Sequence, residues 1–315
     1  MHRSGTSALS GELARLGVFM GKSLYKAQAG VNDKGFWENA RLVAINEDIH
    51  DDINSSWDDP LGLLKQQYAP KEKVAKRALK LVVDEYLHTP LWGMKDPRVS
   101  ILLPFWQKTL DQLNIQPHYI LMIRHPIEVT ASLSKRDGFS QEKGLMLWLN
   151  YNFASFLQTQ NKSRVIVNFD DLLQNPTDIS RKIAETFSLT LPNTGNSSFI
   201  DSSLKRQRAV DGKPNEYGIL LTLSIELFSA ICLDDAIAVA LLRERYQTYL
   251  DQLDTVLVEH LNSVQKSEVH FRTIFEQAYN TFTWKLMRPF KKIEEKIVNT
   301  IKRILNNHSR SEYRK

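Results

Sequence analysis

The sequence predicts an α/β protein, a three-layer sandwich around a central parallel sheet, with a helical extension at its C-terminal end. Between residues 91 and 174, a short apolar segment stops at a polar cluster and leads into a helical pattern three times, in "LWGMKDPR", "HYILMIRHP" and "SRVIVNFDDLL". From about Tyr217 the apolar spacing is helical only. Parallel sheets bind ligands at the carboxyl ends of their strands, so the polar clusters "KDPR", "RHP" and "NFDD" mark the expected site.

The composition is that of a globular protein. Its 315 residues, 42% of them hydrophobic and 24% charged, suffice for one large domain or two small ones. The single cysteine, Cys232, excludes an intramolecular disulfide and a cysteine-based zinc site, and polar residues rather than a signal sequence follow Met1, so a cytoplasmic location is expected. Residues 284–315 have a net charge of +7 and the rest of the chain −2, so no nucleic-acid partner is predicted.

Further helices are expected around the strands. A first helix presents Leu9, Leu13 and Leu16 on one face and ends at Gly17. The segment "VNDKGFWENARLVAINEDIH" is typical of a loop that enters a second helix. A third helix face is indicated by Ala75, Leu79, Val82 and Tyr86. Helices are also expected from about Pro97 and from Pro126, because proline fits the first helical turn.

The C-terminal third is predicted to be helical. The apolar stretch from Ile219 to Leu242 contains three acidic residues and is expected to be buried helix rather than a membrane span. Near-heptad spacing indicates a helical hairpin or a short coiled coil at Tyr246, Leu250, Leu253, Leu257, Leu261 and Val264. A basic amphipathic helix from Phe290 to Ile304 could lie on an anionic membrane at its inner face, or pack on its own domain or a second subunit. We expect three parts, residues 1–210, 211–280 and 281–315.

The opening segment "MHRSGTSALS" is typical of a loop that binds a phosphate or sulfate. The candidate residues are Arg3, Ser4, Gly5, Thr6 and Ser7. Gly5 lets the backbone turn its amides inward, the following helix adds its N-terminal N–H groups, and Arg3 adds a forked positive charge. A Walker A loop is excluded because the G-x-x-x-x-G-K-[ST] spacing is absent. The alternative is a plain Ser/Thr helix cap.

The segment "RHPIEVTAS" predicts a second anion site. Arg124 ends a predicted strand, and Ser132 lies eight residues further on, about two turns into the following helix. An arginine and a serine placed in this way can hold a separate phosphate. The alternative is an ion pair between Arg124 and a carboxylate such as Glu128.

Together these motifs resemble those of the sulfotransferases that use 3′-phosphoadenosine 5′-phosphosulfate. "HRSGTS" resembles their 5′-phosphosulfate loop and "RHPIEVTAS" their 3′-phosphate motif, while "GFWEN", "WGMKDPR" and "FIDSSLKRQR" are similar to segments of the bacterial and carbohydrate-type branch. The resemblance covers about residues 1–210. It implies a nucleotide-binding, P-loop-like fold. It also implies metal-free, in-line transfer of a sulfuryl group to a hydroxyl or amine of a glycan, lipid or small molecule, with 3′,5′-ADP released.

The resemblance also implies roles for Glu38, Lys95 and Arg3. Glu38, which Phe36 and Trp37 flank, is the expected base, and Lys95 and Arg3 are the groups expected to stabilise developing charge. The tyrosylprotein sulfotransferases have a similar "KDP" with a catalytic lysine. The alternatives are an exposed carboxylate at a helix start for Glu38, and a structural Lys95–Asp96 pair that caps a helix.

The other polar residues of these motifs have less specific expected roles. His2 and His125 are expected to orient the loops that contain them. A nucleotide lid or a solvated basic loop is indicated by Lys205, Arg206 and Arg208. The acceptor implied by the resemblance is a carbohydrate or a lipid-linked glycan, and a homo-oligomer is a further expectation.

Two other classes of function stay open. A P-loop kinase or NTPase would place Asp170 of "VIVNFDD" on magnesium, but the sequence lacks the GK[ST] of that class. A non-catalytic scaffold would act through the helical C-terminal part and the basic tail.

Sulfotransferases have a hydrophobic strand before the opening loop, where this chain has only its first residues. We therefore expect an N-terminally shortened chain that lacks the first central strand.

Overall fold

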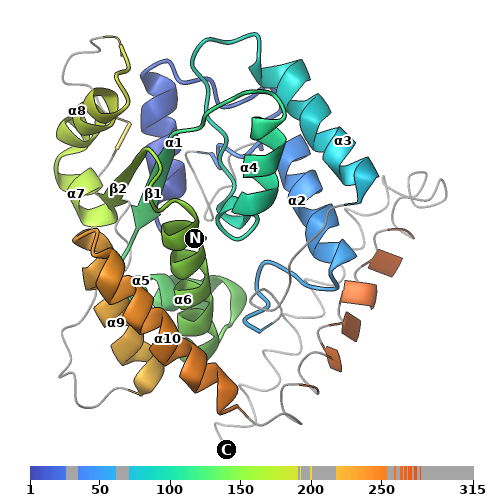
Figure 1. Cartoon of the computed structure of the whole chain (residues 1–315), viewed down its shortest axis with the longest axis vertical. Coiled ribbons are helices and arrows are strands. Elements are labelled where there is room, and N and C mark those ends of the chain that lie inside the picture. Colours follow the sequence, from blue (N-terminus) through green and yellow to red (C-terminus); the bar gives the residue numbers. More distant parts are fainter. Residues whose placement is uncertain are drawn as a thin grey trace, which may run out of the picture. The chain divides into compact units, whose positions relative to one another are not determined.

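The computed structural model describes residues 1–25, 35–61, 71–190, 192, 199–200 and 218–253, together with short runs of one to three positions between 259 and 277. The chain divides into two compact units, Met1–Asn262 and Ser263–Lys315. All helices and strands named below belong to the first unit (Figure 1). The predicted boundaries after residues 210 and 280, the basic helix from Phe290 to Ile304 and the cations at 205–208 lie outside the described residues.

The described sheet has two strands, β1 (Tyr119–Ile123) and β2 (Arg164–Asn168), which pair in parallel. A parallel sheet at these two apolar segments is confirmed. The strand expected at "LWGMK" is wrong, because this segment makes only a single parallel bridge, between Trp92 and Phe19. Gly17 and Gly21, both at positive φ, bracket the partner segment and leave too few extended residues for a ladder. A two-stranded sheet does not by itself make the predicted three-layer sandwich.

Two helices lead from the N-terminal loops. Helix α1 (Thr6–Arg15) follows the opening loop and ends before Gly17, as predicted. Helix α2 (Ala40–Asp52) begins where the Asn39 side chain accepts hydrogen bonds from the first helical N–H groups. The "GFWEN" segment therefore runs directly into α2, and the Asn39 cap fixes the backbone next to Glu38.

The predicted third helix is present, with its buried face displaced by one position. Helix α3 (Glu72–Leu81) continues into a π-helical turn, η2 (Val82–Tyr86). Val74 and Ala78 are buried, whereas Ala75 and Leu79 are half-buried. The buried face consists of Val74, Ala78, Leu81 and Val82, an i, i+4, i+7, i+8 pattern, so Val82 lies on its edge and counting back from Val82 gives the half-buried positions 79 and 75.

The helices after residue 96 pack around the sheet and the opening loop. Pro97 starts a short 3₁₀ turn, η3 (Pro97–Ser100), before α4 (Leu103–Asp111), and Pro126 starts α5 (Pro126–Asp137), both as predicted. The helices that follow α5, up to residue 186, are α6 (Gln141–Gln158), α7 (Phe169–Gln174) and α8 (Pro176–Thr186). Helix α6 packs against α4, α5 and β1, and its Trp148 and Phe156 are fully buried.

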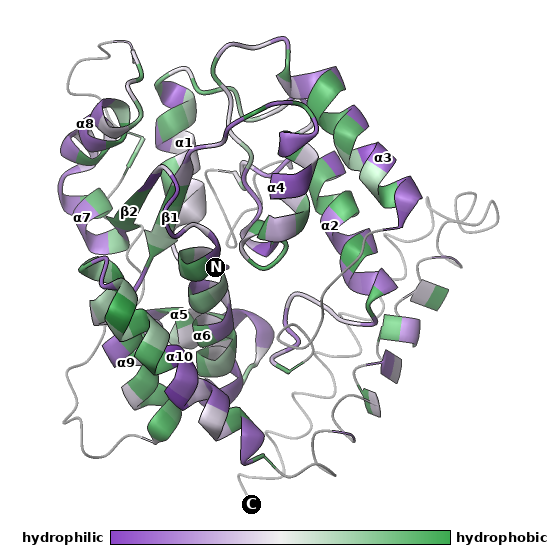
Figure 2. Cartoon of the chain, in the orientation of Figure 1, coloured by the Kyte–Doolittle hydropathy of each residue, from purple (hydrophilic) through white to green (hydrophobic). Residues whose placement is uncertain are grey.

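Helices α9 (Ile219–Cys232) and α10 (Ala236–Asp251) pack on each other as a hairpin, and the helical character expected from Ile219 to Leu242 is confirmed. Of the hairpin or coiled coil expected from Tyr246 to Val264, Leu257 and Leu261 lie outside the described residues, so it stays a prediction. Helix α9 packs on α5, α6 and α10, and Figure 2 shows its predominantly apolar composition. Leu223, Leu227 and Tyr246 of the hairpin share one hydrophobic core with α6. No helix of the described residues is both long and apolar enough to cross a membrane.

Candidate active site

The opening loop has a backbone suited to anion binding. Arg3 and Gly5 both adopt left-handed conformations, with φ of 63° and 87°. Gly5 is required there because a Cβ atom would overlap the Phe169 ring. Left-handed residues alternating with ordinary ones turn successive N–H groups inward, and the first amides of α1 lie next in the chain. The Ser4 hydroxyl is buried and, within the described part of the chain, has no hydrogen-bond partner.

The alternative of a side-chain helix cap does not describe this loop. The residue that caps α1 is Gly5, and no side chain bonds to the cap. Thr6 is the first residue of the helix, and Ser7 directs its hydroxyl to the Phe36 carbonyl, 3.2 Å away. The Ser7 hydroxyl therefore faces another segment rather than the helix end.

The opening loop meets the second predicted anion motif. Arg3 Nε donates a hydrogen bond to Ser132 Oγ at 2.8 Å, and Arg124 Nη1 donates to the Arg3 carbonyl at 3.2 Å. Arg124 directly follows β1, and Trp148 Nε1 bonds to the Arg124 carbonyl at 3.0 Å. Residues more than 120 positions apart in sequence thus lie together at the carboxyl end of β1.

Arg124 also makes the ion pair that the sequence left open. Its Nε atom lies 2.8 Å from Glu128 Oε2, one turn into α5, and both side chains are almost fully buried. The guanidinium lies over the Phe169 ring, 4.4 Å from the ring centre. The same ring closes the space beside Gly5, so Phe169 contacts both anion motifs. These contacts fix Arg124 in place, and its role toward a phosphate stays a prediction.

Lys95 joins the opening loop to Glu38. Its Nζ atom donates to Glu38 Oε1 at 2.6 Å, to the Phe36 carbonyl at 2.8 Å and to Ser7 Oγ at 3.1 Å. The side chains of Lys95 and Glu38 are only 10% and 13% exposed. Glu38 is therefore an enclosed carboxylate with a cationic partner, not the exposed carboxylate of the alternative interpretation.

Burial lowers the pKa of Lys95 and of His2, which lies near the pair. Desolvation lowers the pKa of the Lys95 ammonium, against the raising effect of the Glu38 carboxylate. Burial, and next the Arg98 charge, lower the pKa of His2 well below its usual range, so His2 is neutral at neutral pH. The His2 ring lies 4.4 Å from that of Trp57.

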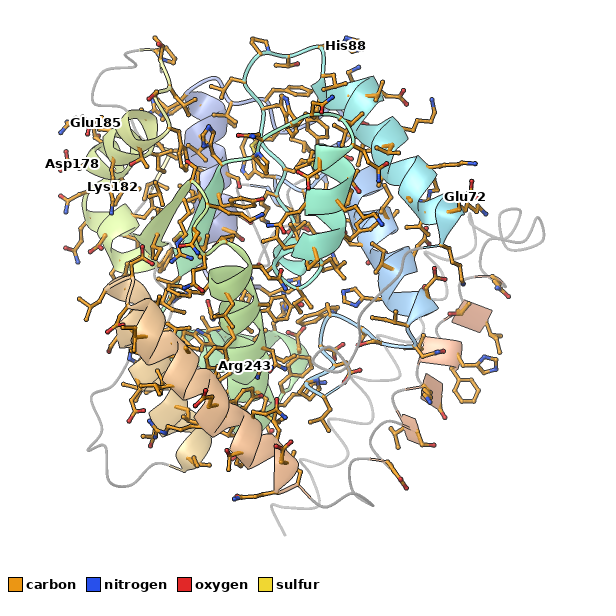
Figure 3. All side chains as sticks on the ribbon, in the orientation of Figure 1. Glu72, His88, Asp178, Lys182, Glu185 and Arg243 are labelled. Atoms are coloured by element: carbon orange, nitrogen blue, oxygen red, sulfur yellow. The ribbon has the colours of Figure 1, made fainter. Side chains whose placement is uncertain are left out.

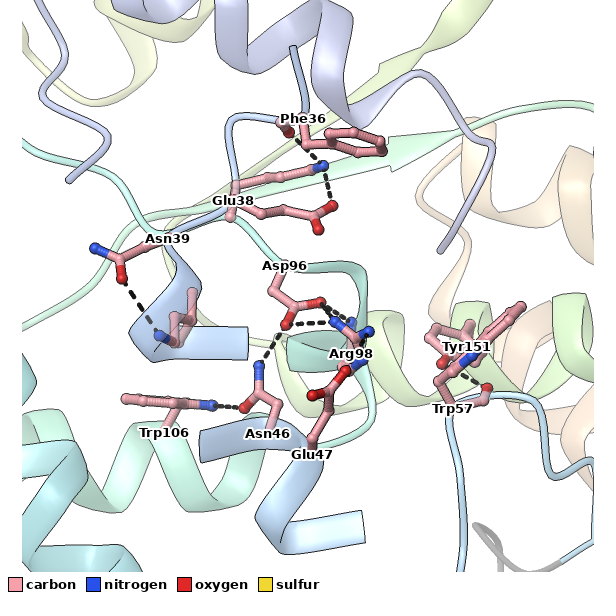
Figure 4. Close-up of polar contacts among 12 residues, drawn as sticks. Phe36, Glu38, Asn39, Asn46, Glu47, Trp57, Asp96, Arg98, Trp106 and Tyr151 are labelled. Carbon is pink, nitrogen blue, oxygen red and sulfur yellow. Dashed lines mark hydrogen bonds and ion pairs between the residues drawn. The ribbon is translucent and has the colours of Figure 1, made fainter. Parts of the chain in front are cut away.

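Behind Lys95, Asp96 anchors a buried polar network (Figure 4). Asp96 Oδ2 accepts from Asn46 Nδ2 at 2.8 Å, and Asn46 Oδ1 accepts from Trp106 Nε1, also at 2.8 Å. Arg98 bonds to Asp96 at 3.0 Å and to Glu47 at 3.2 Å. Asp96 also caps η3 by accepting the Arg98 N–H. The alternative of a Lys95–Asp96 pair is thus half right, because Asp96 is a cap but its ionic partner is Arg98.

Asn46, Glu47 and Trp106 were not predicted from the sequence. Asn46 carries a usable signal, because it is a polar residue on the apolar face formed by Leu42, Ile45 and Ile49, and a buried amide requires partners. Nothing in the spacing identifies Trp106 as one of those partners. The magnesium ligand expected for a kinase, Asp170, is the second residue of α7, and its N–H donates to Asn168 Oδ1.

Comparisons with known proteins give one similarity. No family model and no curated protein sequence matches the chain significantly. Among solved structures, the sulfotransferase domain from the Synechococcus PCC 7002 olefin synthase is similar to it, with a TM-score of 0.44 and 16% sequence identity. The similar region covers 73% of this chain and 91% of that domain.

Proposed function

We propose that this protein is a sulfotransferase that moves a sulfuryl group from 3′-phosphoadenosine 5′-phosphosulfate to a hydroxyl or amine of an acceptor and releases 3′,5′-ADP. The observation that carries the proposal is the position of Lys95. One ammonium contacts Ser7 of the anion loop and the Glu38 carboxylate, 3.1 and 2.6 Å away. A group-transfer site needs this combination, because a cation must lie where donor charge develops and a base must lie beside it.

The donor is supported by the second anion motif. A nucleotide with phosphates on both sides of its ribose needs two separate anion sites. The opening loop supplies one of them, with inward amides, the buried Ser4 hydroxyl and the tight approach at Gly5. Arg124 and Ser132 supply the other, and Arg3, bonded to Ser132, connects the two.

The residues of the site then have distinct roles. The donor supplies an activated sulfuryl group, whose S–O bond to the 5′-phosphate breaks as the acceptor oxygen bonds to sulfur. Glu38 accepts the proton that the acceptor hydroxyl loses. Lys95 and Arg3 stabilise the negative charge that develops on the phosphate side. Lys95 also holds Glu38 against the loop, so that base and donor site keep a fixed separation.

A kinase or NTPase is not favoured. In a Walker A loop the lysine directly follows the last glycine of the motif and precedes the magnesium-binding hydroxyl. Here Thr6 follows Gly5, and the lysine beside the loop is Lys95, on another segment.

We propose a glycan, lipid or small hydroxylated molecule as acceptor. The membrane contact and the second subunit predicted for residues 281–315 stay predictions.

Calorimetric titration with nucleotides in EDTA tests the donor site. We expect 3′,5′-ADP to bind more tightly than 5′-AMP and ATP. Ser132→Ala should weaken 3′,5′-ADP about tenfold, for a lost hydrogen bond to a charged group, and weaken 5′-AMP less, because only 3′,5′-ADP has a phosphate that contacts Ser132. Ser134→Ala, an exposed serine on the same helix, is the matched control and should change neither affinity. Binding of Mg-ATP but not of 3′,5′-ADP would refute the proposal.

A further inference from the structure

Phe199 packs closely against α1, the helix that follows the opening loop. Its N–H donates a hydrogen bond to Oε2 of the buried Glu12 at 2.7 Å. Its ring fills the space beside Gly11, where a Cβ atom would overlap Phe199 Cε1. Gly11 lies in the middle of α1, where glycine is unfavourable compared with alanine. The close approach of the Phe199 ring gives a physical reason for a glycine at this position.

The same ring contacts Trp37, the residue before Glu38. The two ring centroids lie 5.7 Å apart in an edge-to-face arrangement, which is a geometry that aromatic pairs prefer. Within the described part of the chain, the indole Nε1 of Trp37 has no hydrogen-bond partner, so packing positions this side chain. Trp37 also packs against the hydrophobic cluster that contains Leu9 and Leu13 of α1. Phe199 thus contacts both α1 and the residue next to the candidate base.

Trp37 has a backbone conformation that depends on its surroundings. Its φ of 58° is a left-handed value, which a bulky residue keeps only where other contacts hold it. On one side of Trp37 the Phe36 carbonyl accepts from Lys95, and on the other side Glu38 pairs with Lys95. These bonds hold the two neighbours of Trp37, whereas Phe199 contacts its side chain. A change in the Trp37 backbone would move Glu38, because the two residues are adjacent.

We propose that Phe199 is a positioning residue for the candidate base. Its ring holds Trp37 against α1 and so keeps Glu38 at a fixed distance from the opening loop. Phe199 acts through Trp37 and takes no part in proton transfer. A displaced base slows the chemical step and leaves donor binding intact. This inference rests on the proposed function, because Glu38 must be the base.

Two substitutions disturb the contact from opposite sides. Phe199→Ala removes the ring, and Gly11→Ala adds a Cβ atom that displaces it. The readouts are release of labelled sulfate from the donor, with water as acceptor, and transfer to phenyl glucoside, a hydroxylated probe. Each variant should lower kcat about tenfold, less than the ~10²-fold effect of a 1 Å displacement, because Lys95 still holds Glu38. The donor KM and the affinity for 3′,5′-ADP should keep their wild-type values.

The double variant tests the contact itself. The three atoms nearest to a Cβ at position 11 all belong to the Phe199 ring, so this Cβ has space once the ring is absent. Gly11→Ala should therefore lower the thermal unfolding midpoint of the wild type but raise that of Phe199→Ala, since alanine favours a helix. It should not lower kcat further in Phe199→Ala. Equal effects of Gly11→Ala in the two backgrounds would show that the residues do not interact, and would overturn the inference.

Phe187→Ala is the matched control. Phe187 belongs to the same hydrophobic cluster, but it stacks on His118 at the amino end of β1, opposite the site. It follows α8, whose outer side carries the exposed residues Asp178, Lys182 and Glu185 (Figure 3). Phe187→Ala should lower the unfolding midpoint at least as much as Phe199→Ala and leave kcat unchanged.

The outcomes separate this inference from the proposed function. A wild-type kcat in folded Phe199→Ala and Gly11→Ala, or an equal loss of kcat in Phe187→Ala, overturns the positioning role. Weaker 3′,5′-ADP binding in Phe199→Ala also overturns it, because the ring would then act on the donor site. Gly11→Ala, which keeps the ring, decides the matter where Phe199→Ala does not fold. No transfer by the wild type to either acceptor overturns the inference, and failure of the wild type to bind 3′,5′-ADP refutes the proposed function itself.

Discussion

Replacement of Lys95 by methionine gives the most direct test of the site geometry. Met keeps most of the volume of the Lys95 side chain but cannot donate a hydrogen bond. Glu38 loses its cationic partner at 2.6 Å, and the Phe36 carbonyl and the Ser7 hydroxyl each lose a donor. Because the Phe36 carbonyl still accepts from Ser7, the main consequence is an isolated Glu38 carboxylate.

The cost follows from burial. A carboxylate that is 13% exposed and has lost its partner lowers the free energy of unfolding by about 3 kcal/mol. Removal of the charge as well, in Lys95→Met/Glu38→Gln, should recover about 1–2 kcal/mol of this loss, since the two sites are coupled. Lys80→Met breaks an exposed pair with Asp84 and should cost less than about 0.5 kcal/mol.

Urea unfolding of the four proteins measures these differences, and single-turnover transfer from labelled donor measures the chemistry. We expect Lys95→Met to reduce the transfer rate by about 10²–10³-fold, the usual effect of losing one charge-stabilising donor. If Lys95→Met is as stable as the wild type, or if the double variant is less stable than Lys95→Met, the ion pair between Lys95 and Glu38 is wrong. A wild-type rate in Lys95→Met would refute the role of the ammonium in catalysis.

Two further variants test the loop and the lysine. Gly5→Ala should cost about 1–3 kcal/mol in thermal unfolding and weaken 3′,5′-ADP, because φ is +87° and the Phe169 ring fills the Cβ position. Gly138→Ala has a similar φ of +74° but open space, so it should be milder and leave nucleotide affinity intact; equal effects would contradict the packing argument. Since burial lowers the pKa of Lys95, transfer should fall as pH rises through this lowered pKa, while stability rises over the same range because the folded state disfavours the ammonium. Lys95→Arg should abolish this alkaline loss in a pH–rate profile, and an unchanged profile would assign the loss to another group.

Local patterns predicted much of the fold because they depend on neighbours in sequence. The apolar runs before Arg124 and Phe169 are strands, and Gly17, Pro97 and Pro126 mark helix ends and starts as expected. The segment at Trp92 was misassigned because strand formation depends on a partner, and its partner near Phe19 is limited by two glycine turns. Apolar character alone does not contain that information.

The candidate site was predictable in its residue types but not in its pairings. Arg3, Lys95 and Glu38 stand out as residues in motifs, and the structure brings Lys95 and Glu38 together. The sequence pairs Lys95 equally well with Asp96, its neighbour. In the structure, Asn46 and Arg98 bond to the Asp96 carboxylate, and Lys95 pairs with Glu38 instead. Such competition among partners depends on tertiary packing, which spacing cannot show.

Non-glycine residues with positive φ also occur in the two segments that form the candidate site, the opening loop and the segment before Glu38. Among the described residues, the non-glycine positions with positive φ include four asparagine or aspartate residues, which adopt this conformation readily. Ser188, with φ of 53°, has it just after the end of α8. Arg3 and Trp37 also have it, with φ of 63° and 58°, although neither residue type favours it. Arg3 belongs to the anion loop and Trp37 precedes Glu38, and the two segments meet at Lys95, which bonds to Ser7 and Phe36. Strained backbone persists only where surrounding contacts hold it, and it concentrates at functional sites. The strain at Arg3 and Trp37 therefore supports the same location for the site as the Lys95–Glu38 pair does.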